Sequence, residues 1–132
     1  MNKNYNIAKI EVALWNLCRT AFGTSMEVYA GSRPASVATT LEKFCVVAIP
    51  GNVTDYGALG KAYTTIYLYA KNTSTGRKNT TVLSEMHDTL FNFLPYSTED
   101  YFFDFSSEAS FPDSIGYHIT AINLHMMTKK TI

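Results

Sequence analysis

The stretch AYTTIYLYAK, residues 62–71, decides the fold of this 132-residue chain. Tyrosines recur at every second position but one, and successive side chains of a β-strand point to opposite faces of a sheet. One face suits a core covered by helices, and it carries Ala62, Thr64, Ile66, Leu68 and Ala70. The other, here called the tyrosine face, carries Tyr63, Thr65, Tyr67, Tyr69 and Lys71. The alternation therefore predicts a strand between a buried side and an aromatic side.

The tyrosine face has three interpretations, and the residues alone leave them open. An amphipathic aromatic surface suits a protein interface. Ordinary cross-strand aromatic pairs on a half-exposed sheet have the same sequence pattern. Lys61 and Lys71 at its two ends also fit a stacking surface for nucleic acid, although basic ends are common on aromatic strands.

Two helices are predicted on either side of this strand, at residues 5–22 and 80–94, because apolar side chains recur there at the spacing of one helical face. Gly23 suits the end of the first helix, and Asn79 suits the N-cap of the second. The remaining predicted segments are strands at 26–29, 44–49, 101–106 and 115–127, long loops at 31–42 and 51–60, and a turn at 111–114.

The resulting order is helix, three strands, helix, two strands. Helices and strands that are segregated along a chain are typical of an α+β fold. We expect one domain over residues 1–132, with a largely antiparallel sheet of about five strands and both helices packed on one face. The predicted core comprises Ile10, Leu14, Leu17, Val47, Ile66, Leu68, Met86 and Leu90.

The charges balance overall and are unevenly distributed. Eleven basic and eleven acidic residues give zero net charge, which argues against a protein that mainly coats nucleic acid. Residues 1–80 carry nine bases and four acids, whereas residues 81–132 carry two bases and seven acids. Such a chain could attract copies of itself, basic part to acidic part, unless folding mixes the two parts on one surface. No apolar run approaches the ~20 residues that a membrane-spanning helix needs.

The cysteines indicate neither a metal site nor a cofactor site. Cys18 and Cys45 lie among apolar residues, which predicts two buried free thiols. A zinc site would need closely spaced Cys or His pairs, and the sequence has none. We therefore expect no metal and no organic cofactor.

The histidines give no catalytic pattern. Each is interpreted as a surface residue; His118 and His125 fall on opposite faces of one strand, and His87 is adjacent to Asp88 on a helix, where neighbours do not face each other. No nucleophile motif, zinc-protease motif or phosphate-binding loop is present. The sequence thus favours a protein that is not an enzyme.

Several phrases, taken in order, carry a family resemblance. They are the helix ending near Phe22, VYAGSRP at 28–34, FCVV at 44–47 followed by Pro50-Gly51, IYLYAKN at 66–72, the loop that contains Gly76, the helix after Asn79 and the closing strand at 116–124. Over residues 5 to about 127, this order resembles the small tail-terminator and head–tail completion proteins of long-tailed bacteriophages.

The resemblance implies a structural virion protein without catalytic residues. Such proteins form a ring, usually of six copies, that caps the tail tube and joins it to the head–neck connector. The implied partners are other copies of the chain, the tail tube protein and the connector or neck proteins, with DNA only passing through the ring lumen and no membrane contact. The implied location is the tail or neck of the virion, after assembly in the host cytoplasm.

A ring needs two different surfaces on each subunit. The basic candidates for subunit contacts are Arg33, Lys43 and Lys61, and the acidic ones are Glu99, Asp100 and Glu108. Tyr67 and Tyr69 are the candidates for apolar burial. Two alternatives stay open: another neck, head–tail adaptor or baseplate subunit, and a non-viral α+β binding domain or small enzyme. The mass of the protein in solution discriminates between them.

Overall fold

The computed structural model describes residues 6–32, 41–48, 52–57, 59–113 and 115–129. Along the chain, one helix precedes the first four strands and a second helix precedes the last three. Helix α1 spans Ile7–Phe22 and helix α2 spans Thr80–Phe91. Each begins at an asparagine, Asn6 or Asn79, whose side-chain oxygen accepts a hydrogen bond from a backbone N–H three residues later. Such a cap stabilises a helix by about 1 kcal/mol. Gly23 ends α1 at a φ of 61°, a conformation that favours glycine.

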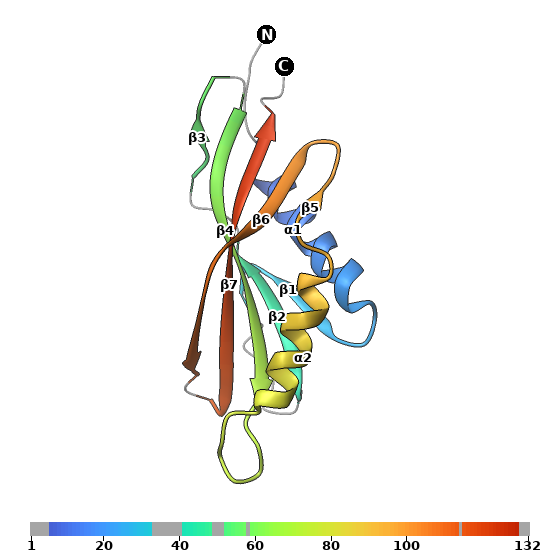
Figure 1. The fold of residues 1–132 in the computed structure, drawn as a ribbon, viewed down its shortest axis with the longest axis vertical. Helices are drawn as coiled ribbons and strands as arrows, with labels where there is room; N and C mark the ends of the chain where they lie inside the picture. Colours follow the sequence, from blue (N-terminus) through green and yellow to red (C-terminus); the bar gives the residue numbers. More distant parts are fainter. Residues whose placement is uncertain (1–5, 33–40, 49–51, 58, 114, 130–132) are drawn as a thin grey trace.

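The described residues form one seven-stranded sheet. Its strands are β1 (Glu27–Ala30), β2 (Lys43–Ala48), β3 (Thr54–Asp55), β4 (Leu59–Lys71), β5 (Tyr96–Ser97), β6 (Tyr101–Pro112) and β7 (Tyr117–Lys129). Their order across the sheet is β1-β2-β4-β7-β6-β5, and β3 pairs with β4. β1 and β2 are parallel, and the other pairs are antiparallel. β4 and β7 run nearly the full length of the molecule (Figure 1).

Both helices pack on the same face of the sheet. One cluster joins Leu14 of α1 and Leu90 of α2 to Ile66 of β4 and Ile122 of β7, all four of them fully buried. All eight predicted core residues are buried. The predicted strand at residues 62–71 is confirmed as part of β4, and its even-numbered residues from Ala62 to Ala70 lie on the side of this core.

The predicted α+β class is confirmed, but the sheet differs in detail from the expectation. It was expected to be largely antiparallel, and it is mixed: β1 runs parallel to β2, and the other pairs are antiparallel. Two strands of two residues each, β3 and β5, were missed, since pairs this short leave no pattern in a sequence. β3 lies in the predicted loop 51–60.

Strand β6 was predicted to end at residue 106, but it continues to Pro112, two residues into the predicted turn at 111–114. A register shift between Phe105 and Ser107 explains the error. A β-bulge adds one residue and reverses the alternation, so the side chains beyond it no longer match the pattern that precedes it. The second helix also ends earlier than predicted, at Phe91, after which Asn92 N–H still bonds to Asp88 O.

Candidate subunit interface

The face of the sheet opposite the helices, here called the open face, is organised in rows that cross the strands. Tyr63 on β4 lies opposite His125 on β7, which lies opposite Asp104 on β6. The next row toward the β3 end consists of Lys61, Met127 and Phe102, and the next row the other way consists of Thr65, Asn123 and Ser107. The tyrosine face of the sequence therefore belongs to this open face.

One end of the open face is closed by the chain itself. We call it the aromatic cluster: Phe44, Val46 and Tyr117 are buried, and Tyr29, Leu41, Tyr67 and Tyr69 pack around them. The rings of Phe44 and Tyr69 stack with centroids 4.3 Å apart, and those of Phe44 and Tyr117 meet edge to face at 5.4 Å. The Tyr117 hydroxyl donates to Leu41 O at 2.6 Å. This end is a second, smaller core.

A polar row separates this closed end from the rest of the face. The Thr65 hydroxyl donates to the side-chain oxygen of Asn123 at 2.8 Å, and the Asn123 amide donates to the Ser107 hydroxyl at 3.1 Å. These side chains pair with one another across three strands. The row marks where the aromatic cluster ends.

The other end of the open face is exposed. We call it the upper patch, because β3 and the adjoining ends of β4 and β7 lie at the top of Figure 1. It consists of Tyr56, Lys61, Tyr63, Phe102, Asp104, His125 and Met127. Tyr63 is 66% exposed and Tyr56 is 62% exposed. These residues line most of a cavity of about 530 Å³.

The exposed rings of the upper patch are held by their neighbours. The Tyr63 and His125 rings lie 4.8 Å apart, and the Lys61 ammonium lies 5.1 Å from the centre of the Tyr56 ring. Aromatic residues and methionine are enriched at protein interfaces, whereas isolated exposed tyrosines carry no such signal. The patch combines them with one carboxylate and one ammonium, so it suits a partner surface that is apolar with a few polar groups.

The structure distributes the sequence-predicted contact residues over both ends. Lys61 belongs to the upper patch, and Glu99 and Asp100 lie beside it, in the turn between β5 and β6, where they line a cavity of about 240 Å³ with Phe102 and Met127. Lys43 lies toward the opposite end, paired with Ala70. Opposite charges thus share one end of the molecule.

The remaining candidates are occupied within the chain or lie outside the described residues. Tyr67 and Tyr69 are half-buried against the aromatic cluster, and Glu108 contacts His87. Arg33 lies outside the described residues.

Tyr63 was missed as a contact residue although it belongs to the predicted tyrosine face. Its exposure depends on β2, which accompanies β4 only from Ala70 to Thr65. Beyond Thr65, the two residues of β3 are the only described ones that pair on that side of β4. One feature of the sequence indicates this exposure: the apolar run that forms β2 is much shorter than the alternating segment that forms β4, so β2 cannot pair along all of β4.

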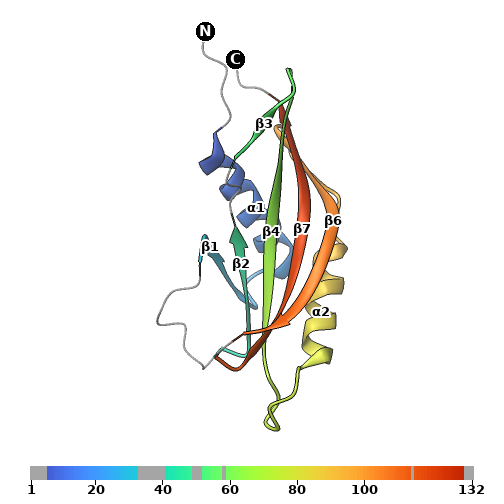
Figure 2. The same cartoon turned by 90° about the vertical axis from the view of Figure 1, so that its left-hand side faces the viewer.

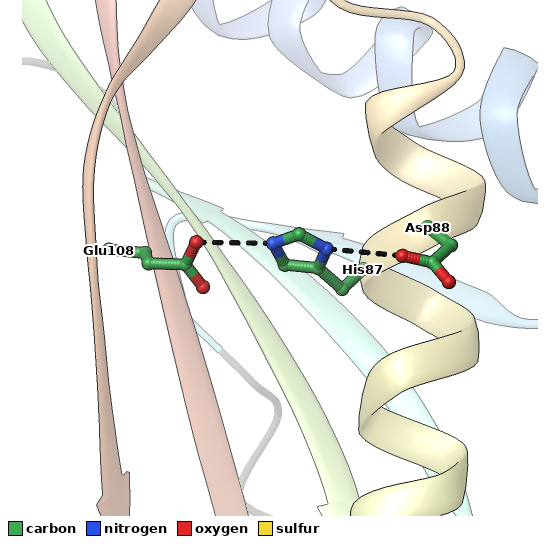
Figure 3. Close-up of polar contacts among 3 residues, drawn as sticks. All are labelled: His87, Asp88 and Glu108. Atoms are coloured by element: carbon green, nitrogen blue, oxygen red, sulfur yellow. Dashed lines mark hydrogen bonds and ion pairs between the residues drawn. The ribbon is translucent and has the colours of Figure 1, made fainter.

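His87 lies between two carboxylates and ties α2 to β6 (Figure 3). Its Nε2 lies 3.2 Å from Glu108, its Nδ1 lies 3.5 Å from Asp88, and its ring stacks on Phe91 at 4.1 Å. The expectation that His87 and Asp88 do not face each other was wrong. The two nitrogens lie on different sides of the imidazole ring. When Nε2 points toward Glu108 on β6, Nδ1 can therefore still contact Asp88, the next residue on α2. Because the Asp88 side chain is 80% exposed, these contacts connect α2 to β6 at the protein surface.

His118 lies on the helix side of β7, opposite to His125, as predicted. It contacts the Ser110 hydroxyl at 3.1 Å. Partial burial, and secondarily the ammonium of Lys78, lower the pKa of His118 below its ordinary value. The neutral imidazole is therefore favoured in the folded protein.

The two cysteines are buried free thiols, as predicted. A hydrogen bond with Cys45 and burial raise the pKa of the Cys18 thiol well above its ordinary value, which keeps it protonated. In the part of the chain that the structure describes, no three metal-ligating side chains gather at one place, and no helix is long and apolar enough to cross a bilayer.

No protein-family model matches the chain, and no curated protein sequence matches it.

Proposed function

We propose that this chain is a structural subunit of a bacteriophage virion: a tail terminator whose copies form a ring, with six as the expected number. The ring caps the tail tube and joins it to the head–neck connector, and DNA passes through its lumen. The proposal combines the order of sequence phrases given above with a surface suited to contact between subunits. It includes no catalytic step.

The observation that carries the proposal is the contrast between the two ends of the open face. Aromatic residues at one end are buried by the chain itself, whereas Tyr63 and Tyr56 at the other end stay more than half exposed beside a cavity. A contiguous exposed apolar patch rimmed by polar groups is typical of interaction sites. In the proposed ring, a neighbouring subunit covers the upper patch.

Two matched variants test this assignment. Tyr63→Asp places a charge in the upper patch, and Val12→Asp places one on the outer side of α1, where Val12 is 57% exposed. Both sites are exposed, so neither change is expected to unfold the protein. Light scattering should give the mass of a ring for the native chain and for Val12→Asp, and assembly at least about tenfold weaker for Tyr63→Asp, since aromatic residues dominate interface energies.

The other outcomes are equally informative. A native chain that stays monomeric at high concentration contradicts a self-assembling ring and favours a subunit that assembles only on its partner. Assembly that is lost in Val12→Asp and kept in Tyr63→Asp places the contact on the helix layer. A clean monomer that binds a small ligand at the upper patch favours the non-viral binding domain or small enzyme.

A further inference from the structure

The two edges of the sheet differ in how their backbone groups are protected. On β1, Gly31 N–H bonds to Val47 O of β2, so alternation directs the backbone groups of Met26 and Val28 away from the sheet. Side chains of α1 cover both carbonyls: Trp15 Nε1 donates to Val28 O at 3.0 Å, and the Arg19 guanidinium donates to Met26 O at 3.1 Å. Along Met26 and Val28, the outward carbonyls of this edge are therefore already occupied by α1.

The opposite edge is formed by the second half of β6. β5 pairs only with Phe102 and Phe103, so among the described residues no strand lies beyond residues 104–112. Asp113 N–H bonds to Tyr117 O of β7 at 2.8 Å. Alternation from this bond directs the backbone groups of Glu108 and Ser110 outward, away from β7. Outward N–H and C=O groups in a row are a template for strand pairing.

The side chains along this edge fit an identical edge. We propose that a second copy of this chain pairs through β6, antiparallel, about a two-fold axis at Ala109. In this register Glu108 of one copy and Ser110 of the other exchange backbone hydrogen bonds, and the two Ala109 residues form the close, non-hydrogen-bonded pair. Every pair then joins residues of the same sheet face, which a two-fold axis perpendicular to the sheet requires.

The charges support this occupant and this register. Lys78 Nζ lies 3.2 Å from the Ser110 hydroxyl within one copy. Because Ser110 faces Glu108 across the axis, Lys78 of each copy would lie beside the carboxylate of the other. That carboxylate contacts its own His87 through one oxygen, Oε1, and the pairing would form two such contacts with Lys78. Glu108 is the only charged residue between Ser106 and Pro112, and no like charge faces it.

This pairing goes beyond the proposed ring. A ring whose subunits all point the same way uses heterologous contacts, whereas a two-fold contact joins a subunit to one outside its own ring. The upper patch and the β6 edge are separate surfaces, so the two contacts can be tested independently.

Disulfide trapping tests the register. Paired Ala109 residues would place their Cα atoms about 4.5 Å apart, within the range that a disulfide bridges. Ser107→Cys is the matched control, because the two copies of residue 107 would lie four residues, or about 14 Å, apart along the strand at ~3.4 Å per residue. Both sites are exposed, and the native cysteines are buried.

With diamide as the oxidant of the thiols, Ala109→Cys should give a disulfide-linked dimer at least tenfold faster than Ser107→Cys. Equal rates for the two variants would indicate random collision and overturn the proposal, whether or not the ring forms. Failure of the ring with rapid trapping of Ala109→Cys would instead overturn the proposed function and leave the pairing standing.

Two changes in the Ala109→Cys background test the backbone and the charges. Ser110→Pro removes an outward N–H that β7 does not use, so it should lower the trapping rate at least tenfold without unfolding the sheet. Lys78→Glu should lower the rate roughly two- to fivefold, and adding Glu108→Lys should restore it. A trapping rate unchanged by Ser110→Pro would contradict strand pairing.

Discussion

The two ends of the open face carry the same kinds of side chain and have different neighbours. Phe44, Tyr69 and Tyr117 at one end form a closed cluster, and Tyr63 and Tyr56 at the other end remain exposed. Tyr63 and Tyr69 lie on the same strand and the same face. Their exposure differs because β2 pairs with β4 beside Tyr69 and ends before it reaches Tyr63.

The comparison teaches that an aromatic face becomes core or surface according to the strand beside it. Where β2 continues, stacking, edge-to-face contacts and a hydroxyl–carbonyl hydrogen bond close the face. Where it stops, the rings line a cavity (Figure 2 shows β3 and the ends of β4 and β7 extending beyond β2). The upper patch is therefore the part of this face that a partner can cover.

The largest effect is expected from breaking the closed end. Phe44→Ala removes a fully buried ring that contacts Tyr29, Tyr69 and Tyr117. Large-to-small changes of this kind cost about 3–5 kcal/mol. Urea unfolding of the variant measures the loss, and a loss below 1 kcal/mol would show that the aromatic cluster is not a second core.

A smaller effect is expected from the hydrogen bond that fastens Leu41 to the cluster. Tyr117→Phe keeps the ring and removes the hydroxyl that donates to Leu41 O. The carbonyl is partly buried, so losing its donor should cost about 0.5–1.5 kcal/mol, the net contribution of an ordinary hydrogen bond. The same unfolding measurement should place this variant between the native chain and Phe44→Ala; a stability equal to the native one would mean that water replaces the hydroxyl.

A pH effect is expected near the closed end, on the helix side of β7. The pKa of His118 is lowered in the folded protein, so the unfolded chain binds the proton first as the pH falls through about 6.5. Stability is thus fully present above that pH and declines below it. Comparing unfolding at pH 7.5 and 5.5, His118→Asn should lose less stability than the native chain, and an equal or larger loss would oppose this assignment.

The smallest effect on stability is expected at the upper patch. Tyr63→Ala changes a side chain that is 66% exposed and sits outside both core clusters. Its free energy of unfolding should stay within about 0.5 kcal/mol of the native value. A loss above 1.5 kcal/mol would show that Tyr63 stabilises the subunit itself, which would remove the contrast between the two ends.

The strand at residues 62–71 could be predicted because burial on one side of a strand gives the sequence an alternation with a period of two. The two helices were readable from their apolar spacing, and all eight predicted core residues proved buried. The bulge after Phe105 could not be predicted, because one inserted residue breaks the alternation and makes the strand seem to end there. The parallel β1–β2 pair also escaped prediction, since direction depends on the connection and not on local pattern.

The candidate site was only partly predictable from the sequence. The tyrosine face was identified, but Tyr67 and Tyr69 were chosen from it, and these pack within the chain. Choosing Tyr63 required knowing where β2 ends beside β4. Likewise, Lys61 was assigned to one charged side and Glu99 to another, and the pairing of β4 and β6 with β7 brings both to one end.

Covalent footprinting of Tyr63 tests the central claim, that the upper patch is the surface covered on assembly, most directly. Nitration of Tyr63 is measured at low and at high protein concentration, with the half-buried Tyr96 on the helix side as the internal reference. The account predicts that Tyr63 reacts readily in the dilute protein and at least about fivefold more slowly once the mass has risen to that of the ring. Assembly with undiminished nitration of Tyr63 would contradict it.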